Sequence, residues 1–502
     1  MSAPADVTRP ATPVAGAGAD ARRLDRSFMR SIAWSGAGRW VTQLITWPAT
    51  VVIARLLSPA DYGLVVLVRV YIDFIGMLTE AGLGGAVTIA PEMDEHRAGQ
   101  LHTLSLLMGA TAVAVSCLIA APLGQLYNRP GFEWVVVAMS TIFIIESIGV
   151  VPNGLLRREF RYKAIAVADW ARGIVDIAVE LTLAFLGFGY WTLVAGAIAG
   201  AATWQVVILL YRPLRFRILR LRDVRDTLRT MGHMVAQGLA NFVVQNSDVM
   251  IAGRLATTGA IGAYSFALQL ASVPSNKIIG LVANVTPSLF REVRTDLPVF
   301  RRYVLLITEA TTVVVLPAFI GITLVAGDFT AAVLGPKWTG AVVPLQLLAL
   351  SAAFKALFAV LPQVLWAVDR GQVVTRYGIL TMLVLPPLFF LLGLEYGVNG
   401  IAAAWLIGAP VAVIPRSWAA CGSIALSKGS YARALWPSVS GVLAMSAAVL
   451  AVQALLSGPE YGALIRLGAC VAAGAVVYAG AILIFHQARV RTALAALRSA
   501  RS

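Results

Sequence analysis

Apolar segments long enough to cross a lipid bilayer recur along almost the whole chain, and they restrict the fold more than any other feature. They lie at about residues 31–54, 61–83, 102–122, 133–152, 166–186, 190–210, 233–254, 260–284, 304–326, 341–366, 376–394, 399–421, 437–456 and 463–485. A helix that spans the hydrocarbon core needs about 20 apolar residues. Only 13% of the residues are charged, and the mean hydropathy is +0.79. The sequence therefore predicts an all-α integral membrane protein with about 14 transmembrane helices, and it excludes a soluble globular enzyme.

Basic residues are concentrated in the connections that an even number of spans places on one side of the membrane. Of the 40 lysines and arginines, 29 fall in the two tails and the even-numbered connections, five in the odd-numbered connections and six within spans. Cytoplasmic loops of membrane proteins accumulate lysine and arginine. We therefore expect both termini in the cytoplasm, and we attribute the net charge of +15 to topology and not to nucleic-acid binding.

A short repeat suggests two related halves. Ile53-Ala54-Arg55-Leu56, followed by Gly63, recurs 199 residues later as Ala252-Gly253-Arg254-Leu255, followed by Gly262. Such repeats are typical of secondary transporters, so we expect two pseudo-symmetric six-helix lobes. The expected divisions are a disordered cytoplasmic tail over 1–27, an N-terminal lobe over 28–210, a basic cytoplasmic connection over 211–231, a C-terminal lobe over 232–421, two appended spans over 422–485 and a basic cytoplasmic tail over 486–502.

The residues that usually carry catalysis or metal binding are scattered. The three cysteines, Cys117, Cys421 and Cys470, fall in separate apolar segments, and the four histidines lack the spacing of metal ligands. The sequence contains no Walker-type phosphate loop. The outer connections are short, the longest being about 123–132 and 327–340. We therefore expect no catalytic residue, no metal and no cofactor, and the class of protein that remains is a secondary transporter.

Three spans of the N-terminal half carry polar residues at helical spacing. They are Arg39, Gln43, Thr46 and Thr50 in the first, Arg69, Asp73, Gly76 and Glu80 in the second, and Asp169, Arg172, Asp176 and Glu180 in the fifth. A charge at bilayer depth costs ~2.5–3.5 kcal/mol on insertion scales, so these stripes should meet in the protein interior. Two interpretations stay open. Either Arg69 pairs with Asp73 and Arg172 with Asp169 or Asp176, or the arginines line a hydrated cavity for an anionic substrate.

The C-terminal half carries mainly amides and hydroxyls at the corresponding depth. Its first span contains Gln237, Asn241, Gln245 and Asp248, and its second contains Ser265, Gln269, Ser272, Asn276 and Lys277. These groups suit sugar hydroxyls, but they serve equally well as hydrogen-bond partners between helices. Lys277 is the cation that we retain as a candidate for substrate binding.

Several motifs resemble a known family. They are Ser35-Gly36-Ala37-Gly38-Arg39-Trp40, Ala54-Arg55-Leu56-Leu57-Ser58-Pro59-Ala60-Asp61-Tyr62-Gly63, Glu80-Ala81-Gly82-Leu83-Gly84, Pro152-Asn153-Gly154-Leu155-Leu156-Arg157-Arg158 and Phe160-Arg161-Tyr162. Over about residues 28–420, the chain resembles the oligosaccharide flippases of the multidrug/oligosaccharidyl-lipid/polysaccharide superfamily, in particular the colanic-acid and teichuronic-acid exporter group.

The resemblance implies a flippase of the bacterial inner membrane that moves undecaprenyl-pyrophosphate-linked oligosaccharide by alternating access, for surface polysaccharide or lipopolysaccharide biosynthesis. The implied partners are this lipid-linked oligosaccharide, the bilayer and other polysaccharide-assembly proteins, with no nucleic acid. The substrate-binding candidates are Arg39, Gln43, Arg69, Arg172, Asn241 and Lys277, and the candidates for ion coupling are Asp73, Asp169, Asp176 and Asp248. The stripes mix arginines with acids, which departs from the cationic cavity described for the family. The alternatives are a drug/cation antiporter of the same superfamily and a membrane-embedded enzyme of glycan assembly.

Overall fold

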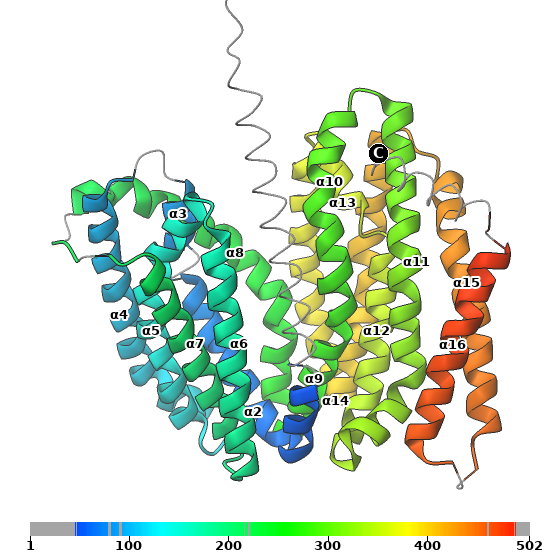
Figure 1. Ribbon diagram of the computed structural model, residues 1–502, viewed down its shortest axis with the longest axis horizontal. Coiled ribbons are helices and arrows are strands. Elements are labelled where there is room, and N and C mark those ends of the chain that lie inside the picture. Colours follow the sequence, from blue (N-terminus) through cyan, green and yellow to red (C-terminus); the bar gives the residue numbers. More distant parts are fainter. Residues whose placement is uncertain are drawn as a thin grey trace, which may run out of the picture.

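In the computed structural model, every regular element among the described residues is a helix (Figure 1). The structure describes residues 46–485 apart from 47, 79–81, 90–92, 215, 219–220 and 459–460, together with residue 487. The first half contains the helix Pro48–Leu56, α2 (Pro59–Gly76), α3 (Gly82–Ile89), α4 (Glu95–Tyr127), α5 (Phe132–Arg158), α6 (Tyr162–Phe185) and α7 (Trp191–Tyr211). The second half contains α8 (Leu221–Leu255), α9 (Thr258–Pro274), η2 (Ser275–Ile279), α10 (Gly280–Val293), α11 (Leu297–Phe329), η3 (Thr330–Leu334), η4 (Pro336–Ala341), α12 (Val342–Ala356), α13 (Leu361–Ala367), α14 (Gly371–Ser423), α15 (Lys428–Leu455) and α16 (Ala463–Phe485).

The protein is a multi-pass membrane protein. Among the described residues, eight helical segments are long and apolar enough to cross a membrane, and the bent pair formed by Pro48–Leu56 and α2 is a ninth. The segment α14 contains a break at Gly397, where φ is +56°, a backbone conformation that glycine adopts without steric cost. Its two parts run antiparallel, since Gly393 approaches Ile401 and Gly408 approaches Leu385.

The helices form two groups (Figure 1). In the N-terminal group, α4 packs on α5 and α6 packs on α7, and in the C-terminal group, α11 packs on α12, α15 and α16. The helices α2, α8 and α9 lie between these groups (Figure 1), and α2 packs along α9. The two groups therefore meet at the contact between α2 and α9, and α8 also joins them, since it packs on both α3 and α14.

The first turns of α2 and α9 approach each other through glycines. A Cβ atom on Gly63 would lie 1.9 Å from the carbonyl oxygen of Thr258, and one on Gly262 would lie 1.8 Å from that of Pro59. Next to this contact, the N-terminus of α2 is closed by a capping box in which the N–H of Asp61 donates to the Ser58 hydroxyl. The repeated Gly63 and Gly262 are therefore required by the packing of the two halves.

Two arginines of the repeat cross between the groups at this end of the bundle. The Arg55 guanidinium donates to the carbonyl of Val333, at the end of η3, and the Arg254 guanidinium donates to the carbonyl of Leu126, near the end of α4. The last carbonyls of a helix lack partners within the helix and attract cations. The two contacts correspond to each other in the two halves. In each, an arginine in the last turn of one helix donates to a carbonyl near the end of a helix in the other group.

A second pair of cations repeats this arrangement in the reverse direction. Arg129, just after α4, donates to the carbonyl of Ala256, and Lys337, in η4, donates to the carbonyl of Arg55 at 3.1 Å. We call Arg55, Arg129, Arg254 and Lys337 together the four-cation latch.

The opposite end of the bundle, which we call the basic end, carries the connection between α7 and α8. Arg212 lies 2.5 Å from Glu95 and 3.1 Å from Glu159, and Phe216 stacks on the ring of His102. The hydrogen bond to Glu95, with the charge of Glu159 beside it, raises the pKa of the Arg212 guanidinium. The predicted basic connection over 211–231 is partly helical, because α8 begins at Leu221.

The two last helices attach to α11 through a buried carboxylate. Asp328 accepts a hydrogen bond from Arg466 of α16 at 2.5 Å and one from Gln453 of α15 at 3.3 Å. The Tyr478 hydroxyl of α16 donates to the carbonyl of Val313 of α11 at 2.6 Å. These polar contacts supplement the apolar packing of α15 and α16 on α11.

Candidate functional site

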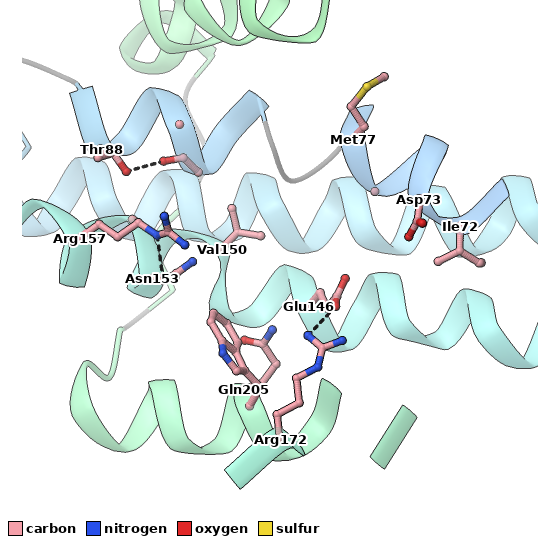
Figure 2. A pocket seen from close by; sticks show the side chains of 15 residues that line it. Ile72, Asp73, Met77, Thr88, Glu146, Val150, Asn153, Arg157, Arg172 and Gln205 are labelled. Carbon is pink, nitrogen blue, oxygen red and sulfur yellow. Dashed lines mark hydrogen bonds and ion pairs between the residues drawn. The ribbon is translucent and has the colours of Figure 1, made fainter. Parts of the chain in front are cut away.

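Two adjoining cavities lie within the bundle. The N-terminal cavity, of about 670 Å³, is formed by α2, α3, α5, α6 and α7. It is lined by Ile72, Asp73, Gly76, Met77, Gly84, Gly85, Thr88, Glu146, Val150, Asn153, Gly154, Arg157, Arg172, Trp204 and Gln205. Figure 2 shows Arg157 and Asn153 at one end of this cavity, the pair of Arg172 and Glu146 in its middle, and Asp73 toward the other end.

The central cavity, of about 570 Å³, lies between the two groups of helices and is lined by residues of α2, α8, α9, η2, α12 and α14. Its polar residues are Arg69, Asp73, Gln245, Asn246, Ser265, Gln269, Ser272, Ser275, Asn276, Lys355 and Trp405. Asp73 borders both cavities, so they adjoin at this side chain. The central cavity combines two cations, one acid and a wall of amides and hydroxyls.

A third, smaller cavity of about 250 Å³ lies between the first helix and α9 and continues into η2. Thr46 and Thr50 line one side, and Lys277 lines the other. It shares Gln269, Ser272 and Asn276 with the central cavity. Lys277 belongs to the π-helical turn that follows Pro274, and such turns recur at functional sites.

The predicted arginines do not share one cavity. Arg69 borders the central cavity and lies 3.7 Å from Asp73, so the predicted pair within α2 is confirmed. Arg172 borders the N-terminal cavity and lies 3.9 Å from Glu146 of α5. The expected pairing of Arg172 with an acid of its own helix is wrong, because the α6 stripe is turned so that Arg172 reaches α5.

The acids of the α6 stripe lie against α7. The carboxylate of Asp169 accepts a hydrogen bond from Nε1 of Trp204 at 3.0 Å. A Cβ atom on Gly196 would lie 2.8 Å from a carboxylate oxygen of Asp176 and 2.4 Å from Cγ of Glu180. The glycine face of α7 therefore makes room for these charged side chains, and neither Asp169 nor Asp176 lines the N-terminal cavity.

Asp248 lies behind the wall of the central cavity and is fully buried. Its carboxylate accepts hydrogen bonds from the Tyr264 hydroxyl at 2.6 Å, from Nε1 of Trp405 at 2.9 Å and from the N–H of Val249 at 2.7 Å. The ammonium of Lys355 lies over the Trp405 ring, 4.5 Å from its centroid. Asp248 is thus surrounded by donors, an arrangement that suits an anion and leaves few lone pairs for a metal.

The remaining candidates are placed only in part. Arg39 and Gln43 lie outside the described residues, and Asn241 lies on α8 with a side chain that is not described. Within the described part of the chain, no group of three histidine, cysteine, aspartate or glutamate residues is arranged to hold a metal ion.

Many residues that line the two cavities are absent from the predicted site, and four of them are charged or aromatic side chains within the predicted spans. They are Glu146, Trp204, Lys355 and Trp405. Glu146 and Lys355 are isolated charges in apolar spans, and this isolation is the signal that could have identified them. The two tryptophans carry no comparable signal, because tryptophan is common in membrane helices.

The described residues form a multi-pass membrane protein whose helical bundle contains two adjoining polar cavities. The family model described as "Polysaccharide biosynthesis protein" matches residues 52–343, and the chain belongs to this family. The resemblance to polysaccharide exporters is thereby confirmed.

Curated relatives include the succinoglycan biosynthesis transport protein ExoT of Rhizobium meliloti (strain 1021), 26% identical over 329 residues. This match covers 65% of the present chain and 66% of ExoT, slightly less than two thirds of that relative. The lipopolysaccharide biosynthesis protein WzxC of Escherichia coli (strain K12) is 21% identical over 366 residues, or 71% of this chain and 73% of WzxC.

Solved structures agree on the fold. The lipid II flippase MurJ, in an inward closed conformation, matches with a TM-score of 0.73 at 12% identity, over 91% of this chain and 100% of MurJ. An inward-facing MATE family multidrug transporter matches with a TM-score of 0.60 at 15% identity, over 76% of this chain and 94% of that chain. The protein therefore has a MurJ/MATE-like helical fold.

Proposed function

We propose that the protein is a flippase that moves undecaprenyl-pyrophosphate-linked oligosaccharide across the bacterial inner membrane for the synthesis of a surface polysaccharide or lipopolysaccharide. The observation that carries this proposal is the central cavity, which Arg69, Lys355 and Asp73 line together with amides and hydroxyls. Family membership supports a polysaccharide cargo, as do the relatives ExoT, a succinoglycan biosynthesis transport protein, and WzxC, a lipopolysaccharide biosynthesis protein.

The chemistry of the cargo fits this cavity. A pyrophosphate and a hydrated glycan must cross ~30 Å of hydrocarbon, while the polyprenyl tail can stay in the lipid. Arg69 supplies a planar guanidinium that pairs with two phosphate oxygens, and Lys355 adds a second cation. We assign the pyrophosphate to this cavity. Lys277 lines the third, smaller cavity, which adjoins it. Arg39, Gln43 and Asn241 remain proposed contributors from the helices that border it.

We also propose fourteen spans, arranged as two six-helix lobes over 28–210 and 232–421 with two appended spans over 422–485. In support of this arrangement, the described helices overlap the predicted ranges, and Gly397 falls between the predicted spans 376–394 and 399–421. Most of the span predicted over 31–54 lies outside the described residues. In this topology both termini and the basic end are cytoplasmic. The four-cation latch then closes the outer side, and the two lobes alternate between openings to the two sides.

Among the coupling candidates, Asp73 is best placed to link an ion to the substrate. It borders both cavities, lies beside Arg69, and its side chain is half exposed. Protonation of Asp73 would free the Arg69 guanidinium for phosphate. The other candidates are engaged with neighbouring groups, Asp169 with Trp204, Asp176 with α7 and Asp248 with three donors.

A drug/cation antiporter is the second candidate function. The acids Asp73 and Glu146 in the N-terminal cavity and the fold shared with a MATE transporter favour it. The excess of cations in the central cavity favours an anionic cargo instead. A glycan-assembly enzyme has less support, because the relative ExoT is named as a transport protein.

The test is deletion of the gene in its source bacterium, with complementation by wild type, Arg69→Lys, Arg69→Ala and the control Arg376→Ala, an exposed residue of the basic end. A bidentate charge-assisted contact is worth about 1.5–3 kcal/mol, so export by Arg69→Ala should fall about tenfold or more, with partial rescue by lysine. Surface polysaccharide is measured against membrane abundance. A deletion strain with normal surface polysaccharide contradicts the proposal.

A further inference from the structure

We propose that the N-terminal cavity is a carbohydrate-binding subsite, which receives the glycan of the cargo while the pyrophosphate occupies the central cavity. This inference rests on the proposed function. The cavity lies within the N-terminal group of helices, between α5, α6 and α7 on one side and α2 and α3 on the other (Figure 2). It adjoins the central cavity at Asp73, so one extended molecule can occupy both.

The lining of this cavity carries equal numbers of positive and negative side chains, which distinguishes it from a site for phosphate or for a cation. Its lining contains two arginines, Arg157 and Arg172, and two acids, Asp73 and Glu146. A phosphate site needs an excess of cations and a drug-cation site needs an excess of anions. A sugar hydroxyl instead both donates and accepts. The guanidinium groups supply donors, the carboxylates supply acceptors, Thr88 and Asn153 supply both, and the Gln205 amide supplies N–H donors.

Gln205 is held rigidly in the wall. It is only 5% exposed, and a Cβ atom on Gly149 of α5 would lie 1.5 Å from its Oε1. This oxygen is buried without a hydrogen-bond partner. Only a glycine at position 149 leaves room for the Gln205 amide, and this packing fixes the amide at the edge of the cavity. A polar group ordered in advance costs less entropy when it binds a ligand.

Trp204 provides an aromatic surface in the same wall. Its Nε1 donates a hydrogen bond to the carboxylate of Asp169 at 3.0 Å, and this bond restricts rotation of the indole. The ring lines the cavity. Pyranose rings have an apolar face of C–H groups that packs on aromatic rings, while their hydroxyls bond to planar polar side chains. A fixed indole beside Gln205, Arg172 and Glu146 offers both kinds of contact.

The test uses the full-length protein in membranes of the source bacterium, with p-benzoylphenylalanine in place of Trp204, Gln269 or Val206, one position per variant. Gln269 borders the central cavity, and Val206 is a matched control, 58% exposed and two residues along α7 from Trp204. The probe is the cell's own lipid-linked oligosaccharide, labelled with tritiated sugar and ³²P-phosphate. After irradiation, mild acid hydrolyses the bond between the first sugar and the pyrophosphate. An adduct formed through the glycan then keeps tritium and loses ³²P.

We expect acid-resistant tritium on the Trp204 variant and none on the Val206 variant. Tritium on the Gln269 variant with none at position 204 would overturn the subsite while leaving the proposed function intact. If no variant acquires tritium and deletion of the gene leaves surface polysaccharide normal, the proposed function itself fails.

A second measurement does not depend on the photoreactive residue. Replacing Trp204 by leucine should lower export about fivefold to tenfold at unchanged membrane abundance, because the aromatic contact is lost. Val206→Leu should export normally. Normal export by Trp204→Leu, or a loss matched by lower abundance, overturns the subsite.

Discussion

At the scale of single residues, Asp248 is a charged group at bilayer depth that is held by partners on other helices. Asp248 of α8 accepts hydrogen bonds from Tyr264 of α9 and from Trp405 of α14, which is 157 residues away in sequence. The indole of Trp405 in turn lies beneath the ammonium of Lys355 of α12. One buried carboxylate thus connects four helices behind the central cavity.

This network predicts the effect of removing one hydroxyl. In Tyr264→Phe, the buried Asp248 loses its donor at 2.6 Å, and Nε1 of Trp405 loses an acceptor at 3.1 Å. Leaving a buried polar group without its partner costs about 1–3 kcal/mol. Thermal unfolding of the purified protein in detergent should therefore begin at a lower temperature. Tyr396→Phe, at a residue 63% exposed, is the control. Equal unfolding temperatures for wild type and Tyr264→Phe would contradict this account of Asp248.

The sequence predicts which charged residues share one face of a helix, but it does not predict which residues of other helices they contact. Helical spacing places Asp169, Arg172 and Asp176 on one face of α6, but it does not specify the neighbouring helix that this face meets. That neighbour depends on the small residues of α7. A Cβ atom on Gly200, for example, would lie within 3.4 Å of both Arg172 and Asp176. Arg172 consequently pairs with Glu146, an acid that spacing alone does not single out.

At the scale of elements, the contact of α2 with α9 depends on two glycines that the repeat already relates. Added methyl groups at Gly63 or Gly262 would meet backbone carbonyls, which cannot move aside as a flexible side chain does. The helices themselves follow from apolar length and could be predicted. The π-helical turns η2 and η3 could not, since their extra residue per turn depends on local packing and not on composition.

Gly262→Ala should separate α2 from α9. Overpacking a tight contact costs typically 1–3 kcal/mol, so we expect lower thermal stability and reduced export. Gly259→Ala is the matched control, because it lies on the first turn of the same helix and its added methyl group meets nothing within 4 Å. Stability measured by heating and export measured as surface polysaccharide should both stay at the wild-type level in Gly259→Ala. The packing argument fails if the two variants behave alike.

At the scale of the whole molecule, the four-cation latch joins the two groups of helices at one end only. Figure 1 shows α2 and α9 at this end, away from the basic end where α3 and α10 lie. Arg55 and Arg254 each contribute a charged hydrogen bond across the groups. In the proposed alternating-access cycle, opening at the latch end must break both bonds, so their strength would set the balance between the two states.

The double variant Arg55→Ala/Arg254→Ala should shift this balance toward the state open at the latch end. Each charged hydrogen bond is worth roughly 1.5–3 kcal/mol, so losing two should change the ratio of states about 100-fold or more. Spin labels at Phe188 and Tyr461, which are exposed at this end in the two groups, report the opening as a longer distance. Arg376→Ala is the control. An unchanged distance distribution in the double variant argues against a latch.

The most direct test of the central claim is translocation by the purified protein. Proteoliposomes are prepared with lipid-linked oligosaccharide extracted from the deletion strain, and a membrane-impermeant glycosidase is added outside. With wild-type protein, the fraction of glycan cleaved should rise beyond the share initially in the outer leaflet, and Arg69→Ala should slow this rise about tenfold or more. Cleavage that stops at the outer-leaflet share with wild-type protein, as in protein-free vesicles, would contradict the claim that this protein moves lipid-linked oligosaccharide.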